Sequence, residues 1–329
     1  MDNKPSSGVL RHHAEVFLAA MMREGCTELV VNGINNAFIE VNGQWSPAHG
    51  LATTEDIKPF FLALASYSSA SFDKNQPLLS ASLPSGERVQ ALQAPVVADF
   101  ALSIRKPSTL DLDFDAYAQQ GAFKFDASAS HQDSEKVDQS ITALLKEENI
   151  KEAIELMVKA KKTIIISGGT SSGKTTFFNA LAKLIDIEER LVTIEDTREI
   201  NLIQQNRLYL VAQRNSSSAT FNSLLEACLR LRPDRILAAE LRGPLEALAF
   251  LEGANTGHPG SISTVHSNST THTIRRLTMM LMRANIGLAQ QDIIDYVNDT
   301  VDVFIHFDRD SKNTRSIREI SFGGEVYKK

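Results

Sequence analysis

The sequence predicts a two-domain α/β protein, in which a smaller α+β domain precedes a domain built on a mainly parallel, doubly wound sheet. Three observations predict this fold class. The chain has 329 residues, whereas a typical domain has about 100–200. Short strand-like segments joined by tight turns fill the first third of the chain, and strand-like and helical segments alternate in its second half. A polar, acidic stretch separates the two patterns.

Composition excludes several classes of protein. Hydrophobic residues make up 43% of the chain and charged residues 22%, which are ordinary globular values and exclude a wholly disordered chain, a collagen and a coiled-coil rod. The net charge of −6 argues against a dedicated double-stranded DNA binder, although it leaves a local basic channel open. The two cysteines form no CxxC pair, so neither a structural zinc site nor a disulfide scaffold is supported.

The sequence gives no sign of export or of a membrane span. The first residues lack the apolar segment of a signal peptide, and no apolar run approaches the ~18 residues that a spanning helix needs. We therefore expect a cytoplasmic protein, for which peripheral docking on a membrane stays open.

The N-terminal domain is expected over residues 1–110. Apolar residues at helical spacing predict a helix over residues 9–24, and a second helix is expected to begin near Thr53, a good N-cap residue. Turn signals such as Asn32-Gly33 separate the strand-like segments. These segments cover residues 28–32, 37–41, a stretch ending at Trp45, 79–83, 87–94 and 99–105.

Residues 111–140 are predicted to be a linker. They contain seven acidic residues and two basic ones, and residues 126–140 have almost no large apolar side chain. A long surface loop within one domain is the alternative, but loops of that length are uncommon in compact domains.

The C-terminal domain is expected over residues 141–329. A helical segment at 141–160 is followed by the apolar run 163–167, a glycine-rich loop and a helix from about Lys174. The short apolar runs of this half of the chain have few polar interruptions, as is typical of strands that are covered on both faces. This pattern favours a parallel sheet. The remaining strand-like segments are 191–194, 208–211, 235–239 and 261–265, with helices expected near 220–230, 244–254 and twice more beyond.

The glycine-rich loop carries the strongest functional signal. It fits the pattern G-x-x-x-x-G-K-[ST], with an apolar strand before it and a helix after it, which is the setting that a phosphate-binding loop needs. Backbone N–H groups and the helix N-terminus would bind phosphate oxygens, Lys174 would reach the β- and γ-phosphates, and the Thr175 hydroxyl would bind Mg²⁺. A small-molecule kinase uses the same loop, so the loop alone does not select a reaction. The predicted binding residues are Gly168, Gly169, Thr170, Ser171, Ser172, Gly173, Lys174, Thr175 and Thr176.

Two acidic residues follow apolar runs in the predicted sheet. Glu195 lies at the end of one run, where a carboxylate could orient or deprotonate an attacking water, although a cap formed by Asp196 explains the same pattern. Glu240 ends the next run, where an acid meets Mg²⁺, usually through water.

Two histidines lie in the segment TGHPGSISTVH at positions 256–266. Their spacing does not fit a zinc site, since no cysteine is near and the two are not on adjacent helical turns. His266 or His258 at a strand end could sense the γ-phosphate, and a hydrogen-bonded structural histidine is the alternative.

These segments together resemble a known family. The phosphate loop, TIEDT, RPDRILAAELR and TGHPGSISTVH occur in this order and resemble the Walker A, Asp box, Walker B and His box of the secretion-ATPase superfamily. SGERVQ (85–90) and SIRKPS (103–108) are similar to the type IV secretion system ATPases of the VirB-eleven type. The resemblance covers about residues 10–310. It implies a RecA-like C-terminal domain, a PAS-like N-terminal domain, a homohexameric ring, and ATP hydrolysis with Mg²⁺.

The resemblance also implies roles for individual residues. Lys174 and Thr175 would hold phosphate and Mg²⁺, Glu195 would be the water-activating base, and Glu240 the Walker B acid. His266 would be the His-box histidine with His258 in support. Arg88 and Arg105 match arginines that in the family reach the nucleotide across the domain cleft, as a fork-shaped guanidinium that binds phosphate can do. One departure is Ala239, where the family usually has glycine before its glutamate.

The family works at the cytoplasmic face of the inner membrane, in pilus biogenesis and in the export of DNA or protein. The resemblance therefore implies peripheral membrane association and other ATPases or components of the secretion system as partners, and we expect no sequence-specific nucleic-acid binding. Three alternatives stay open. They are a type II secretion or retractile pilus motor, a nucleotide-gated docking scaffold, and a nucleic-acid helicase, the last disfavoured by an aromatic content of only 7%.

Overall fold

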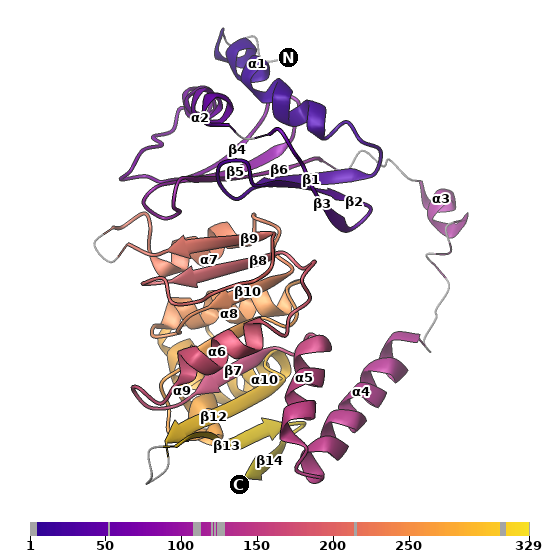
Figure 1. Ribbon diagram of the computed structural model, residues 1–329, viewed down its shortest axis with the longest axis vertical. Helices are drawn as coiled ribbons and strands as arrows, with labels where there is room; N and C mark the ends of the chain where they lie inside the picture. Colours follow the sequence, from indigo (N-terminus) through magenta and orange to yellow (C-terminus); the bar gives the residue numbers. More distant parts are fainter. Residues whose placement is uncertain are drawn as a thin grey trace.

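The computed structural model describes residues 5–51, 53–107, 113–119, 121, 123, 129–213, 216–309 and 314–328. Two sheets follow one another along the long axis of the molecule, and a connecting segment runs beside them (Figure 1). Among the described residues no helix is long and apolar enough to cross a membrane.

The N-terminal sheet has six antiparallel strands in the order β3-β2-β1-β6-β5-β4. The helices α1 (Pro5–Ala20) and α2 (Thr54–Ser68) pack together on it, with Phe17 and Phe60 in the shared core. Thr53 caps α2 through a reciprocal pair of hydrogen bonds with Asp56, which confirms the predicted helix start. The strands are β1 (Cys26–Val31), β2 (Ala37–Val41), β3 (Gln44–Pro47), β4 (Leu78–Ser82), β5 (Arg88–Gln93) and β6 (Phe100–Arg105).

The connecting segment contains two helices, α3 (Phe114–Gln119) and α4 (Ala129–Lys146). The second part of the linker predicted over residues 111–140 is helical, which was not predicted from the sequence. The reason is that Val137, Ile141, Leu144 and Leu145 recur at helical spacing and pack against the second core. Residues 108–112, 120, 122 and 124–128 lie outside the described residues.

The C-terminal sheet has eight strands in the order β14-β13-β12-β7-β11-β10-β8-β9. The six strands from β12 to β9 in this order run parallel, which confirms the mainly parallel sheet. Its strands are β7 (Ile164–Ser167), β8 (Leu191–Glu195), β9 (Arg207–Val211), β10 (Arg235–Ala238), β11 (Ile262–Val265), β12 (Val303–Arg309), β13 (Arg315–Phe322) and β14 (Glu325–Lys328).

Helices cover both faces of this sheet. Ile165 points into a core shared with α7 to α10, whereas its neighbours Ile164 and Ile166 point into a core shared with α4 to α6. Strands buried on both faces need apolar residues at every position, which explains the uninterrupted apolar runs. The helices are α5 (Ile150–Lys159), α6 (Lys174–Ala182), α7 (Phe221–Cys228), α8 (Pro244–Asn255), α9 (Thr270–Arg283) and α10 (Gln290–Thr300).

The two sheets contact each other where β9 meets the β5–β6 connection (Figure 1). Val211 N donates to Val96 O at 2.8 Å, and Val96 and Val97 join the core that contains Leu208 and Leu210. Polar contacts add to this interface, since Arg190 donates to Asn32 Oδ1 at 2.8 Å. Buried apolar and polar contacts together hold the N-terminal sheet against β9, the edge strand of the parallel sheet.

Candidate active site

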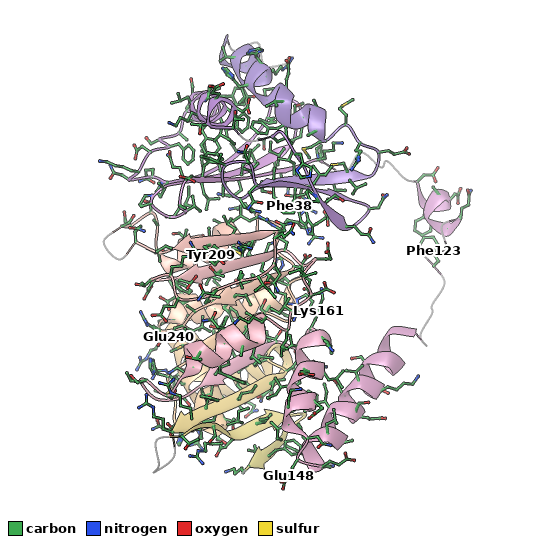
Figure 2. The ribbon with its side chains drawn as sticks, viewed as in Figure 1. Phe38, Phe123, Glu148, Lys161, Tyr209 and Glu240 are labelled. Atoms are coloured by element: carbon green, nitrogen blue, oxygen red, sulfur yellow. The ribbon has the colours of Figure 1, made fainter. Side chains whose placement is uncertain are left out.

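A pocket of about 320 Å³ lies at the carboxyl edge of the parallel strands. β7, β8, β10 and β11 all end beside it, as expected for ligand sites in open α/β sheets. Figure 2 labels Glu240 at this edge of the sheet. The structure brings together six predicted residues on the pocket wall: Thr170, Ser171, Lys174, Thr175, Glu240 and His266.

The backbone of the phosphate loop requires glycine at two positions. Gly173 has a φ of 103° and precedes the first residue of α6. A Cβ on Gly168 would lie 2.1 Å from Phe307 O and 2.7 Å from Ser172 Oγ. The loop thus packs closely against β12, and among the described residues the buried Ser172 Oγ has no hydrogen-bond partner. A tight, backbone-lined cradle at a helix N-terminus fits a phosphate group.

Lys174 lies in the centre of this cradle. Its Nζ donates to Gly168 O at 2.8 Å and to Gly169 O at 2.7 Å, and lies 3.4 Å from His266 Nδ1. Burial lowers the pKa of Lys174, and the charges of Glu240 and Asp308 oppose that shift. The two hydrogen bonds to the loop carbonyls hold the side chain against the loop, at the mouth of the pocket.

Glu240 connects the loop to two further groups. Its Oε1 lies 3.1 Å from His266 Nε2, and its Oε2 accepts a hydrogen bond from Arg242 at 3.0 Å. Arg242 also pairs with Asp196, and its pKa is raised chiefly by the hydrogen bond to Glu240. Lys174, His266, Glu240, Arg242 and Asp196 therefore form one continuous polar network.

Sequence reasoning did not assign a role to Arg242. The available signal was its position two residues after Glu240, in the segment quoted for the Walker B resemblance. In extended backbone, residues two positions apart point to the same side, so the side chains of Glu240 and Arg242 can meet.

The prediction that Glu195 activates water is wrong for this arrangement. Glu195 is fully buried and does not line the pocket. Its Oε1 accepts from Thr193 Oγ1 at 2.8 Å, and its Oε2 accepts from the backbone N–H groups of Glu199 and Ile200 at 2.6 and 2.8 Å. The carboxylate thus fixes the turn that presents Asp196, Thr197 and Glu199 to the pocket.

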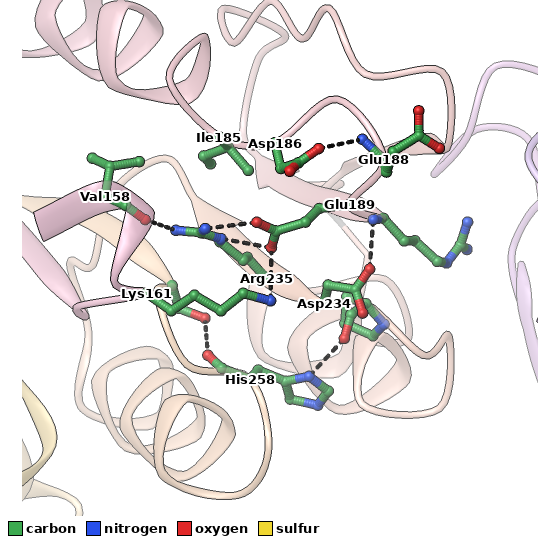
Figure 3. Close-up of polar contacts among 12 residues, drawn as sticks. Val158, Lys161, Ile185, Asp186, Glu188, Glu189, Asp234, Arg235 and His258 are labelled. Carbon is green, nitrogen blue, oxygen red and sulfur yellow. Dashed lines mark hydrogen bonds and ion pairs between the residues drawn. The ribbon is translucent and has the colours of Figure 1, made fainter. Parts of the chain in front are cut away.

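His258 is likewise not part of the pocket. It is buried, its Nδ1 lies 2.8 Å from Pro233 O, and burial lowers its pKa (Figure 3). The structural alternative therefore describes His258, and the predicted supporting role is wrong in this structure.

The start of β10 beside His258 is fixed by a buried ion pair. Arg235 donates to both carboxylate oxygens of Glu189, at 2.8 and 2.7 Å, and to Val158 O at 2.8 Å (Figure 3). Burial acts to raise the pKa of Glu189, but the hydrogen bonds and charge of Arg235 hold it below its usual value. This pair anchors the strand that carries Glu240 at its other end.

Arg88 and Arg105 do not reach the phosphate loop of their own chain. They are neighbours in register on β5 and β6 and line a different pocket, of about 470 Å³, between the N-terminal sheet and the segment before β10. Arg230 and Arg232 also line it, together with the carboxylate of Glu28. Within one chain these arginines therefore lie beside the segment that precedes β10, away from the phosphate loop, and their predicted contact with the nucleotide requires a second copy of the chain.

Known proteins with similar sequences cover nearly the whole chain. A sequence model of the family described as "Type II/IV secretion system protein" matches residues 65–309. The type IV secretion system protein VirB11 of Bartonella quintana is 30% identical over 90% of this chain and 88% of its own length. The VirB11 protein of Brucella suis biovar 1 is 33% identical over 85% and 80%, and a probable conjugal transfer protein TrbB of Sinorhizobium fredii is 32% identical over 89% and 82%.

A solved structure agrees with this relationship. The crystal structure of the VirB11 ATPase from the Brucella suis type IV secretion system, in complex with sulphate, superposes with a TM-score of 0.88. It is 31% identical to this chain, and the match covers 96% of this chain and 95% of that one. With its phosphate loop, strand-end acid and strand-end histidine in one pocket, the chain belongs to the type II/IV secretion system protein family.

Proposed function

We propose that this chain is an ATP-hydrolysing motor of a type IV secretion system, acting in pilus biogenesis and in the export of DNA or protein. The observation that carries the proposal is the continuous network of Lys174, His266 and Glu240 at the mouth of the phosphate loop. The similarity of the chain to VirB11 proteins over most of its length favours a type IV system over a type II secretion or pilus-retraction motor.

Each residue of the network has a role that follows from its chemistry. The ammonium of Lys174 and the backbone N–H groups of the loop stabilise negative charge on the transferred phosphoryl group. His266 contacts both Lys174 and Glu240, so it can report the state of the phosphate site to the adjacent strand ends. Asp196, Glu199 and Glu240 are the pocket carboxylates that can orient a water molecule.

The residues present also fit Mg²⁺. The Thr175 hydroxyl and the Glu240 carboxylate line the same pocket, and oxygen donors of these two kinds are the ligands that Mg²⁺ prefers. When bound with ATP, the ion would neutralise charge on the phosphates.

We further propose a homohexameric ring that associates peripherally with the inner membrane and with other components of the secretion system. The arrangement of the two pockets supports assembly. Arg88 and Arg105 lie at one edge of the chain and the phosphate loop at the other, so head-to-tail packing of copies would bring them together. Each nucleotide site would then be completed by a neighbouring copy.

The experiment for the activity is phosphate release from ATP by the purified full-length chain, with and without Mg²⁺. Lys174→Ala tests the loop, and Lys183→Ala is the matched control, because Lys183 is exposed directly after α6 and outside the pocket. Turnover that depends on Lys174 and not on Lys183 supports the proposal. Tight ATP binding without turnover, in the presence of partner proteins, would favour the docking scaffold instead.

A further inference from the structure

A basic hollow of about 820 Å³ extends along α9 and adjoins the nucleotide pocket. It reaches the phosphate loop at Gly169 and Thr170. None of its lining residues is acidic, and six are arginines or histidines: Arg242, Arg275, Arg276, Arg283, His266 and His272. We call this surface the α9 hollow.

The charges of the α9 hollow are largely uncompensated. Arg242 pairs with Asp196 and Glu240, but Arg275, Arg276 and Arg283 form no ion pair with any residue that the structure describes. The sequence of α9 contains no acidic residue. Three exposed guanidinium groups along one helix therefore favour an acidic partner.

The α9 hollow also offers apolar contact. Met279 lines it and is 55% exposed, and Met282, one turn further along the helix, is 47% exposed. Methionine surfaces adapt to inserted side chains and make favourable sulfur–aromatic contacts, while arginine stacks on aromatic faces. The partner that fits this surface is acidic and carries exposed aromatic rings.

A segment of this same chain has that chemistry. Phe114, in the first turn of α3, and Phe123, just after the helix, are 77% and 49% exposed, and their ring centroids lie 4.6 Å apart. Asp113 and Asp115 flank Phe114, and both are exposed. Figure 1 shows α3 standing apart from both sheets, and Figure 2 labels Phe123 there. An exposed aromatic pair gains from burial against a partner.

We propose that α3 of one copy docks in the α9 hollow of a second copy. Asp113 and Asp115 would pair with Arg275 and Arg276, and the two phenylalanine rings would cover Met279 and the arginine side chains. The partner is a second copy because α3 and α9 lie on opposite sides of the molecule (Figure 1). The inference rests on the self-association in the proposed function. It adds a consequence, since a segment docked beside Gly169 couples assembly to nucleotide binding.

Photo-crosslinking in the full-length chain tests the contact directly. Phe114 is replaced by p-benzoylphenylalanine, and the chains that carry this residue are mixed with wild-type chains that carry a heavy isotope. The isotope distinguishes crosslinks between two copies from crosslinks within one copy. We expect crosslinks between copies, from position 114 to Met279 or Met282. The same replacement at Leu62, which is 72% exposed on α2, is the control and should not link to α9. Links that join position 114 to another surface, or no links between copies, would overturn the docking.

Exchanging the charges of α3 and α9 provides a second, independent test of the docking. Asp113→Arg with Asp115→Arg, and separately Arg275→Asp with Arg276→Asp, should each weaken self-association by about tenfold, and combining all four should restore it. Glu135→Arg with Glu147→Arg is the control, because both are exposed acids outside α3. Absence of rescue overturns the docking. Failure of the proposed motor would appear separately, as absence of ATP turnover in a sample whose crosslinks are intact.

Discussion

The two polar pockets at opposite edges of the chain differ in how their charges are matched. At the carboxyl edge, Lys174, His266, Glu240, Arg242 and Asp196 satisfy one another in one network. At the other pocket, Arg232 pairs with Glu40 and Asp234. Arg105 has only the more distant Glu28, and Arg88 and Arg230 have no ion pair with a residue that the structure describes. A matched network holds its groups in place for a ligand, whereas unmatched guanidinium groups need an anion from elsewhere.

The arginine pocket is therefore described better as part of a site than as a whole one. The Nε of Arg105 lies 3.9 Å from Glu28 Oε2, and neither Arg88 nor Arg230 forms an ion pair with a described residue. Burial raises the pKa of Glu28 to about 7, although the hydrogen bond from Ser103 and the charge of Arg105 act to lower it. Glu28 thus compensates the arginines only partly near neutral pH.

The largest expected effect is at the matched pocket. Lys174→Ala should reduce ATP turnover by about 100-fold or more, because one charge contact to the transition state contributes ~3 kcal/mol or more. Phosphate release at saturating ATP measures this loss. If the variant kept more than about a tenth of the wild-type rate, the loop would not be the catalytic one.

Glu240→Gln should slow turnover by at least about tenfold while nucleotide binding is retained. The amide keeps the shape of the side chain but loses the charge that pairs with Arg242 and organises Mg²⁺. Turnover and the Kd for a fluorescent ATP analogue are measured on the same preparation. An unchanged rate would make Glu240 a structural partner of Arg242 only.

The unmatched pocket should affect nucleotide preference. The double variant Arg88→Ala/Arg105→Ala should lose most of the preference for ATP over ADP, since two charge-assisted contacts contribute about 1.5–3 kcal/mol each. Competition binding of ATP and ADP to the assembled protein measures the ratio. Equal affinities in the wild type, or an unchanged ratio in the variant, would remove these arginines from the nucleotide site.

The smallest expected effect is on the pH dependence of stability. The pKa of Glu28 is about 7 in the folded chain and near 4.5 when unfolded, so the folded state binds the extra proton between these values. The free energy of unfolding should therefore fall by about 1–3 kcal/mol as pH rises from 4.5 to 7. Glu28→Gln should flatten this decline, as measured by thermal unfolding across that range. A decline of equal slope in both proteins would contradict the role of Glu28.

The sequence was sufficient for the parts of the site that local pattern determines. The strand, loop and helix around Lys174 are contiguous, and parallel strands end at one edge, so Glu240 and His266 had to lie near the loop. Glu195 also lies at a strand end, but its carboxylate accepts hydrogen bonds from the backbone N–H groups of Glu199 and Ile200. These bonds direct the carboxylate toward the following turn and away from the pocket. No pattern within the strand distinguishes these two outcomes.

Other features depend on contacts between distant segments. The placement of Arg88 and Arg105 follows from how the N-terminal sheet packs against β9, which neither strand's sequence specifies. The strands β12 to β14 were not predicted, because polar residues such as His306, Asp308 and Arg309 break their apolar pattern. The first part of α4, residues 129–140, was missed because Val137 is its one large apolar residue, whereas residues 141–146 fall within the helical segment predicted over 141–160.

The central claim is that one copy's arginine pocket completes the neighbouring copy's phosphate-loop pocket. The most direct measurement mixes Lys174→Ala with Arg88→Ala/Arg105→Ala and records ATP turnover of the mixed assemblies. Each variant alone should turn over ATP slowly, since the first lacks the loop ammonium and the second lacks two charge contacts to the γ-phosphate. If sites form between copies, interfaces that pair an intact loop with intact arginines reappear, and an equal mixture should recover about a quarter of the wild-type rate. If mixed assemblies form and the mixture stays as slow as either variant alone, the claim is contradicted.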